Sequence, residues 1–340
     1  MSEELRVGQL FVFGVSGSHL STAERAAIET NHLGSVWLVG TRTGGTASIR
    51  TLTAEIQKLA TGPNTSGVAF FVGADQEGGL VQRLKGPGFS TIPSALTQGG
   101  YTTDVLQSDS AMWGRELADA GVNLDFAPVM DVVPRGADAS NPPIGALDRE
   151  YGHDPATVGS HGAAVVRGMK EAGVATSLKH FPGLGRVVAN TDTAAGVVDT
   201  STTADDPYLE AFRSGVSAGA PFVMISLATY SAIDPGRPAV FSPAIVEGLL
   251  RRKLGFEGVV LSDDLGATAS VKSVAPGERA TSFIAAGGDL MIVQGAIPTG
   301  QMAAALLHRA TSDAGFSTIV DAAALHVLRA KAAVGLLRCG

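Results

Sequence analysis

The chain has 340 residues, of which 45% are hydrophobic and 17% charged, so it can bury a large core and is not an intrinsically disordered chain. It carries 25 Lys and Arg against 32 Asp and Glu, a net charge of −7, which argues against nucleic acid as a partner. A single cysteine, Cys339, excludes an internal disulfide, and with seven scattered histidines it predicts no metal site.

The N-terminal residues favour a cytoplasmic protein. Residues 1–6 carry acids early, and no basic segment leads into an apolar run there, as a secretory leader would. No stretch reaches the ~18 consecutive apolar residues of a membrane span. We therefore expect a cytoplasmic protein with no membrane partner, although a chain trimmed of its leader would look the same.

Eight short apolar runs predict β-strands. The runs are continuous rather than alternating, which is typical of parallel strands that are covered on both faces. Glycine, at 43 residues, punctuates the runs and suits tight turns between strands and helices. The predicted strands are residues 9–15, 34–40, 68–75, 123–128, 176–182, 221–227, 258–265 and 289–294.

Segments with helical spacing separate these runs, most clearly at residues 109–120, 155–172, 243–253 and 299–312. Pro155 suits a first helical position, where its missing N–H costs nothing. Eight strands that alternate with helices predict a single (β/α)8 barrel over residues 1–340, with no second α/β domain. An open doubly wound sheet is the alternative, but no GxGxxG motif opens a helix after the first strand.

Polar residues gather where the predicted strands end. Asp75 follows the third strand, Lys179 and His180 lie in the fifth, and Asp263 and Asp264 lie in the seventh. Chemistry in a barrel takes place at the C-terminal ends of its strands, so we expect these residues to meet. Each also has a purely structural interpretation, such as a capping aspartate, for which Asp264 is favoured, or a buried ion pair.

Other polar residues are interpreted as structural. Asp125 and Asp131 follow an apolar run with no cation nearby in the sequence, so they are taken as structural. The six histidines other than His180 fall in predicted loops or helices and are taken as surface or packing residues. They are His19, His32, His153, His161, His308 and His326.

Two kinds of chemistry suit such a group of residues. A pair of carboxylates that flank a sugar could cleave a glycosidic bond, one attacking the anomeric carbon and the other moving the proton. Alternatively, Lys179 could form a Schiff base with a carbonyl substrate, as in an aldolase, which requires a depressed lysine pKa.

Four segments together resemble glycoside hydrolase family 3, specifically its single-domain β-N-acetylhexosaminidases of the type that recycle cell-wall fragments. The resemblance extends from about residue 8 to the closing Leu336-Leu337. The lysine–histidine segment and the Ser-Asp-Asp-Leu segment are specific only in combination. The matching segments are DQEGGLVQR at 75–83, FAPVMDV at 126–132, KHFPG at 179–183 and LGFEGVVLSDDL at 254–265.

The resemblance implies a (β/α)8 barrel that acts on a small carbohydrate without a cofactor. It places the family's nucleophile on Asp263, which would form a glycosyl-enzyme, and its sugar-gripping acid on Asp75. The family's remaining sugar-binding positions fall on Arg83, Arg149, Lys179 and His180.

The chain departs from the family pattern at the general acid/base. Members of the N-acetylhexosaminidase branch carry an Asp-x-His dyad on the loop after the fifth strand, where this chain has Asn190-Thr191-Asp192. A carboxylic acid in a suitable environment can do the same work, so we predict Asp192 as the acid/base. A shift of the loop would bring Asp199 forward instead, and otherwise Asp192 only caps a turn.

The predicted function is a retaining exo-β-N-acetylglucosaminidase acting on glycans or cell-wall fragments. Related glucosidases take their acid/base from a second domain, so its expected absence favours a loop-borne group. The alternatives are a β-glucosidase or a phosphorolytic glycosidase of the same fold, and a non-catalytic sugar-binding barrel. The retained Asp263 argues against the last, since pure binding needs no nucleophile.

Overall fold

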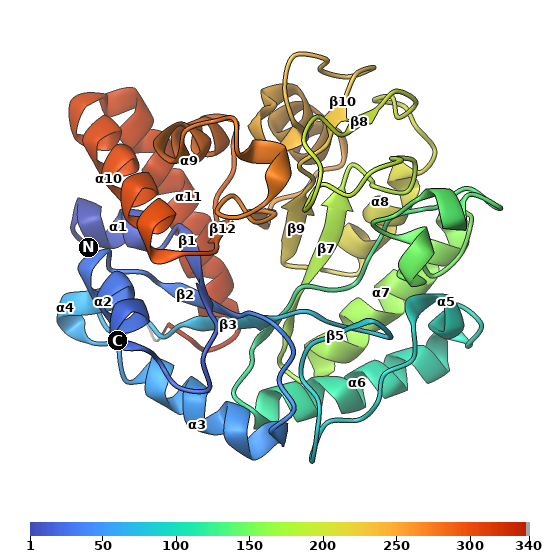
Figure 1. Cartoon of the computed structure of the whole chain (residues 1–340), viewed down its shortest axis with the longest axis horizontal. Coiled ribbons are helices and arrows are strands. Elements are labelled where there is room, and N and C mark those ends of the chain that lie inside the picture. The colour runs from blue at the N-terminus through green and yellow to red at the C-terminus, as the bar shows by residue number, and fades with distance from the viewer. Residues whose placement is uncertain (338–340) are drawn as a thin grey trace.

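Eight parallel strands form the centre of the molecule, and helices surround them (Figure 1). The computed structural model describes residues 1–337, so Cys339, the single thiol, lies outside the described residues. The observed strands are β1 (Phe11–Val15), β2 (Ser35–Leu38), β3 (Phe71–Ala74), β6 (Leu124–Asp125), β7 (Ala175–Phe181), β9 (Phe222–Ile225), β11 (Val259–Ser262) and β12 (Met291–Val293). Seven of the eight predicted strands contain an observed strand, and the predicted strand at 176–182 overlaps β7, which begins one residue earlier.

The sheet closes on itself. Its strand order is β11-β9-β7-β6-β3-β2-β1-β12, and every adjacent pair is parallel. The two outer strands meet at a parallel bridge between Leu261 and Leu290, and the Ser262 N–H donates to the Leu290 carbonyl over 2.9 Å. The predicted (β/α)8 barrel is therefore confirmed, and the open doubly wound alternative is wrong.

Apolar side chains cover both faces of the strands. Inside the barrel, Phe71 and Phe222 pack edge to face with their ring centroids 5.3 Å apart. On the outside, residues such as Phe13 and Val72 pack against the helices. Burial on both faces explains why the strand segments are continuous apolar runs. Gly73 belongs to this packing, because a Cβ there would lie 2.6 Å from the Phe126 ring.

Helices alternate with the strands along the chain, and each of the four predicted helical segments is observed as a helix. Helix α7 (Pro155–Glu171) begins at Pro155, and the Asp154 side chain caps it by accepting from the Thr157 N–H. The segment predicted at 243–253 forms η4 (Ala244–Lys253), a wide helix of the π type. The remaining helices are α1 (Glu3–Gly8), α2 (Thr22–Thr30), α3 (Gly45–Gln57), α4 (Gly62–Thr65), α5 (Ala95–Gln98), α6 (Thr103–Asp119), α8 (Leu209–Ser217), α9 (Pro276–Ala285), α10 (Ala296–Ser312) and α11 (Ala314–Ala333).

Short helices and strands lie in the loops that follow the C-terminal ends of the barrel strands. The loop from β6 to α7 is the longest and carries two 3-10 turns. The short elements are β4 (Gln76–Gly78) with β5 (Val81–Gln82), η1 (Asp138–Ser140), η2 (Gly145–Leu147), β8 (Val198–Asp199) with β10 (Thr229–Tyr230), η3 (Ala239–Phe241) and η5 (Ala269–Val271).

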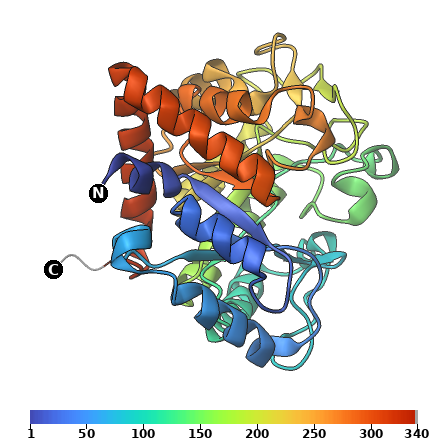
Figure 2. The ribbon, with the colours of Figure 1, turned by 60° about the vertical axis from the view of Figure 1, so that its left-hand side comes forward.

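The two ends of the described chain pack together. Helix α1 lies against α10 and α11, so the first helix and the last two form one side of the molecule (Figure 2). Within residues 1–337, none of the helices combines the length and the apolar character that crossing a membrane requires.

Candidate active site

A small pocket opens at the C-terminal face of the barrel. Its base comes from side chains of the strands, and its wall comes from the loops after β6, β7 and β11. The lining residues are Trp37, Asp75, Phe126, Pro143, Lys179, His180, Leu184, Asn190, Thr191, Asp192, Met224, Asp263, Asp264 and Ile292.

Asp263 directly follows β11 and faces this pocket. One of its oxygens accepts the Asp264 N–H over 2.8 Å, which holds the carboxylate in one orientation. Burial, reinforced by the negative charge of Asp192, raises the pKa of Asp263 to about 6, although the nearby His180 opposes the shift. The carboxylate is therefore ionised at neutral pH, and it accepts few hydrogen bonds that would weaken it as a nucleophile.

The adjacent Asp264 has a different role. Its carboxylate accepts the backbone N–H groups of Gly266, Ala267 and Gln294 over 2.7–3.1 Å. It thus ties the turn after β11 to the end of β12. The favoured expectation that Asp264 caps the following backbone agrees with these contacts, although the segment it caps is a turn and not a helix.

Asp192 lies on the loop after β7, is exposed, and lines the same pocket as Asp263. The Asn190 side-chain oxygen accepts the Asp192 backbone N–H over 2.9 Å, so Asn190 forms the turn and leaves the Asp192 carboxylate to the pocket. The alternative acid, Asp199, is buried and accepts hydrogen bonds from both the backbone and the hydroxyls of Ser201 and Thr202. That capping role keeps Asp199 away from the pocket.

Two neighbouring loops hold the Asp192 loop in place. From η5, the Ser270 hydroxyl lies 2.8 Å from the carbonyls of both Thr191 and Ala194, and the Ala269 N–H donates to the Asp192 carbonyl. On the other side, a Cβ at Gly185 would lie 1.9 Å from the Val132 carbonyl, so the chain approaches the β6 loop as closely as only glycine allows.

Lys179 connects two acids at the base of the pocket. Its Nζ lies 2.8 Å from Asp75 and 2.6 Å from Glu77, and the side chain is almost fully buried. Burial alone would lower the pKa of Lys179, but the two carboxylates raise it above its ordinary value. A protonated lysine is a poor amine nucleophile, so this environment is unfavourable for the Schiff-base alternative. The Trp37 indole donates to the second oxygen of Asp75 over 3.0 Å.

Arg149 supports the pocket indirectly, by binding Glu77. The guanidinium forms a two-pronged pair with that carboxylate, at 2.7 and 2.8 Å, and also donates to the Pro143 carbonyl. Burial works against ionisation of Glu77, but Arg149 and Lys179 together lower its pKa to about 2. Arg149 is not among the pocket-lining residues within the described chain, so its visible role is to hold Glu77 and, through it, Lys179.

Arg83 is placed differently from the other predicted site residues. It follows β5, its side chain is half-buried, and its backbone bonds to Asp75 and Arg42. Among the described residues that line the pocket, Arg83 does not appear. The structure therefore brings together Asp75, Lys179, His180, Asp192 and Asp263, holds Arg149 behind them, and leaves Arg83 to one side.

Asp131, which was interpreted as structural for want of a nearby cation, is the partner of His180. One oxygen lies 2.7 Å from His180 Nδ1, and the other accepts the backbone N–H groups of His180 and Leu184. An Nδ1–H donated to Asp131 leaves Nε2 as the ring atom available to a ligand. The interpretation therefore missed a residue that orients the site, since its partner, His180, lies 49 positions away in the chain.

Asp125 is fully buried beneath the same group of residues. One oxygen accepts the Gln76 N–H, and the other has no hydrogen-bond partner among the described residues. Burial raises the pKa of Asp125 to about 7, with further contributions from Asp75 and Glu77. An aspartic acid that holds its proton near neutral pH limits the negative charge below the pocket.

The pocket offers carboxylates and cations for a polyhydroxylated ligand. Among the described residues, the one His/Asp/Glu group with metal-ligand proximity lies elsewhere, at Asp138, Glu150 and His153. The chemistry available in the pocket is thus an ionised carboxylate, a second carboxylate on an adjacent loop, and a clamp of buried charges that can hydrogen-bond sugar hydroxyls.

Comparisons with known proteins agree on the family. The model of the glycosyl hydrolase family 3 N-terminal domain matches residues 3–330. The chain is 35% identical over 295 residues to a β-hexosaminidase of Stenotrophomonas maltophilia strain K279a, covering 84% of this chain and 83% of that one.

Solved structures give the same result. The β-N-acetylhexosaminidase of Beutenbergia cavernae superposes with a TM-score of 0.96 at 48% identity, over 98% of this chain and 99% of that one. A family 3 β-N-acetylglucosaminidase from Paenibacillus sp. FPU-7 gives 0.88 at 29% identity, over 100% of this chain and 64% of that one. The chain therefore belongs to glycosyl hydrolase family 3 and is a glycoside hydrolase.

Proposed function

We propose that the protein is a retaining exo-β-N-acetylhexosaminidase that removes terminal GlcNAc from glycans or cell-wall fragments. The observation that carries the proposal is the placement of Asp263 and Asp192 on two different loops in one pocket. Support for the sugar comes from the names of relatives that align over most of their length.

In the first step, the ionised Asp263 carboxylate attacks the anomeric carbon. A bond forms between an Asp263 oxygen and that carbon while the glycosidic C–O bond breaks. Asp192 supplies a proton to the departing oxygen, so the aglycone leaves as a neutral alcohol. The sugar remains as an ester of Asp263.

In the second step, Asp192, now ionised, takes a proton from water. The water oxygen attacks the anomeric carbon, the ester bond to Asp263 breaks, and the carboxylate is restored. Two displacements at one carbon return the sugar to its original β configuration.

The charged clamp gives a reason why the pocket suits a sugar terminus. Asp75, fixed by Lys179 and Trp37, retains lone pairs that can accept from sugar hydroxyls, and His180 presents Nε2. The pocket is walled by loops on the side of Pro143 and Leu184, which favours the end of a chain over its middle. A buried polar clamp pairs its groups only when the hydroxyls are in place, which confers specificity.

The test is release of p-nitrophenol from the β-GlcNAc and β-glucose glycosides, with and without phosphate. We expect turnover of the GlcNAc glycoside, unchanged by phosphate, and its loss in Asp263→Asn. Asp192→Ala should lose activity that azide restores, because a small anion needs no general base. Asp119→Asn, at an exposed aspartate on α6, is the matched control and should behave like the parent.

Other outcomes would contradict the proposal. Faster turnover of the glucose glycoside would indicate a β-glucosidase, and dependence on phosphate would indicate a phosphorolytic enzyme. Binding of GlcNAc without turnover of either glycoside would indicate a sugar-binding barrel.

A further inference from the structure

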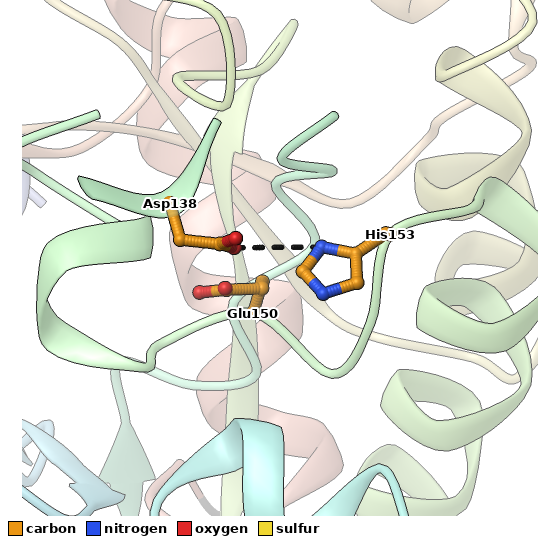
Figure 3. A group of neighbouring side chains, drawn as sticks. All are labelled: Asp138, Glu150 and His153. Carbon is orange, nitrogen blue, oxygen red and sulfur yellow. Dashed lines mark ion pairs between the residues drawn. The ribbon is translucent and has the colours of Figure 1, made fainter. Parts of the chain in front are cut away.

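A second cluster of polar side chains lies outside the pocket, within the long loop between β6 and α7. Asp138 begins η1, and Glu150 and His153 come three residues apart just before α7. Figure 3 shows the two carboxylates beside each other with the imidazole ring next to them. One ligand atom from each of the three residues lies within 4.8 Å of those of the other two.

The carboxylate of Glu150 has no compensating partner. Its side chain is 0% exposed, and neither of its oxygens has a hydrogen-bond partner among the described residues. Oδ1 of Asp138 is buried and equally unpartnered. Ionised carboxylates only accept hydrogen bonds, so the two cannot satisfy each other. Burying unpaired carboxylates is costly, and buried charges are ordinarily paired or bound to metals.

The nearby cations do not neutralise this cluster. Arg149, the neighbour of Glu150 in the chain, is engaged by Glu77 and the Pro143 carbonyl. His153 Nδ1 lies 3.5 Å from Asp138 but 3.2 Å from the Val133 carbonyl, so a proton on Nδ1 is directed to that carbonyl and leaves Nε2 as the ring nitrogen that can bind a ligand. Among the described residues, the two Glu150 oxygens therefore have no protein donor, and Asp138 Oδ1 has only the His153 ring nitrogen, at 3.5 Å.

We propose that Asp138, Glu150 and His153 bind one divalent transition-metal ion, with Zn²⁺ the best match. Zinc takes imidazole nitrogen and carboxylate oxygen together, commonly with three protein ligands and a water as the fourth. In a tetrahedral site with ligand bonds of ~2.0–2.2 Å, the ligand atoms lie roughly 3.4 Å apart, so the three side chains close by an ångström or so around the ion. Ca²⁺ and Mg²⁺ prefer all-oxygen sites and should bind more weakly.

The ion would tie the two ends of one segment together. Residue 138 and the pair at 150 and 153 lie on either side of η2, so coordination fixes the segment between them. That segment includes Arg149, which holds Glu77 and thereby Lys179 in the pocket. The role of the ion is structural, and it takes no part in the proposed hydrolysis. The sequence predicted no metal site, because it has one cysteine and only scattered histidines.

The test measures zinc bound by chelator-treated protein after equilibrium dialysis. We expect one zinc per chain, and at least a tenfold loss of affinity in Glu150→Gln and in His153→Gln. At a free zinc concentration 100 times Kd, the unfolding midpoint should rise by about 4 °C in the parent and not in these variants. His308→Gln, at an exposed histidine on α10, and Asp192→Asn, in the pocket, are the controls and should keep the parental affinity.

Anomalous X-ray diffraction at the zinc absorption edge, from a zinc-soaked crystal of the parent protein, does not depend on whether the variants fold. We expect an anomalous peak within ~2.0–2.2 Å of one atom of each of the three residues. A peak only at another site would overturn the proposal, as would the absence of bound zinc. So would binding that Glu150→Gln and His153→Gln leave unchanged.

Discussion

Replacing Arg149 with methionine tests whether this arginine supports the pocket through Glu77. The substitution keeps a long side chain but removes the guanidinium that pairs with Glu77 over 2.7 and 2.8 Å. Burial opposes ionisation of Glu77, but Arg149 and Lys179 together lower its pKa from 4.5 to about 2, a net preference for the ionised form that is worth about 3 kcal/mol. Breaking a buried ion pair by removing one partner typically costs ~3–5 kcal/mol, which agrees with this figure.

We therefore expect Arg149→Met to lower the free energy of unfolding at pH 7 by about 3 kcal/mol. For a chain of 340 residues, this corresponds to a fall of about 4 °C in the unfolding midpoint. Because the folded-state pKa of Glu77 lies below its unfolded value, the contribution is complete above pH ~4.5 and is lost as the pH falls toward 2. The difference between parent and variant should therefore shrink at low pH.

Urea unfolding between pH 7 and pH 3, followed by circular dichroism, measures both effects. Arg213→Met removes an exposed arginine paired with Glu210 and should cost less than about 1 kcal/mol. A loss in Arg149→Met no larger than in Arg213→Met would refute the reasoning. So would a difference between Arg149→Met and the parent that grows as the pH falls.

Three further predictions concern the pocket. The acid limb of kcat/KM should have a midpoint near pH 6, because Asp263 must be ionised. A pH–rate profile with an activated aryl glycoside measures this, and a midpoint near the ordinary aspartate pKa of ~4 would contradict it. Asp131→Asn should lower kcat/KM by roughly 10–100-fold by releasing His180, and steady-state kinetics with an unchanged value would show that the pair is only structural. Ser270→Ala should lower kcat with an unfolding cost of only about 1 kcal/mol, since it frees the Asp192 loop; equal kcat in the parent and the variant would exclude an anchoring role.

The barrel could be predicted because strands that are buried on both faces appear in the sequence as continuous apolar runs. Each apolar run overlaps a strand, and every observed barrel strand except β7 is shorter than its run. Residues 68–75, for example, contain only Phe71–Ala74 as strand, because Ala69 bonds to the C-terminal segment instead. Strand ends depend on where hydrogen-bonded neighbours stop, which an apolar run does not record. Periodicity also did not distinguish the π-type helix η4 from an α-helix.

The candidate site was predictable where its residues lie at strand ends. Asp75, Lys179 and Asp263 were singled out by position, and the barrel brings them to one pocket. The partners Glu77 and Arg149 are 72 positions apart, so their pairing carries no local pattern. Asp131 was set aside for the same reason, since its partner, His180, lies 49 positions away and approaches only after the sheet has formed. For Asp192, sequence comparison supplied the position and the fold supplied its proximity to Asp263.

The most direct test of the central claim is to quench the reaction rapidly with a dinitrophenyl β-GlcNAc glycoside and analyse the protein by peptide mass spectrometry. Asp192→Ala is the form to use, because a good leaving group needs no acid while breakdown of the intermediate needs a base. The proposed mechanism predicts one sugar unit attached to the peptide that contains Asp263, and a β-configured product in the parent reaction. An α-configured product without an adduct, or an adduct on another residue, would contradict it.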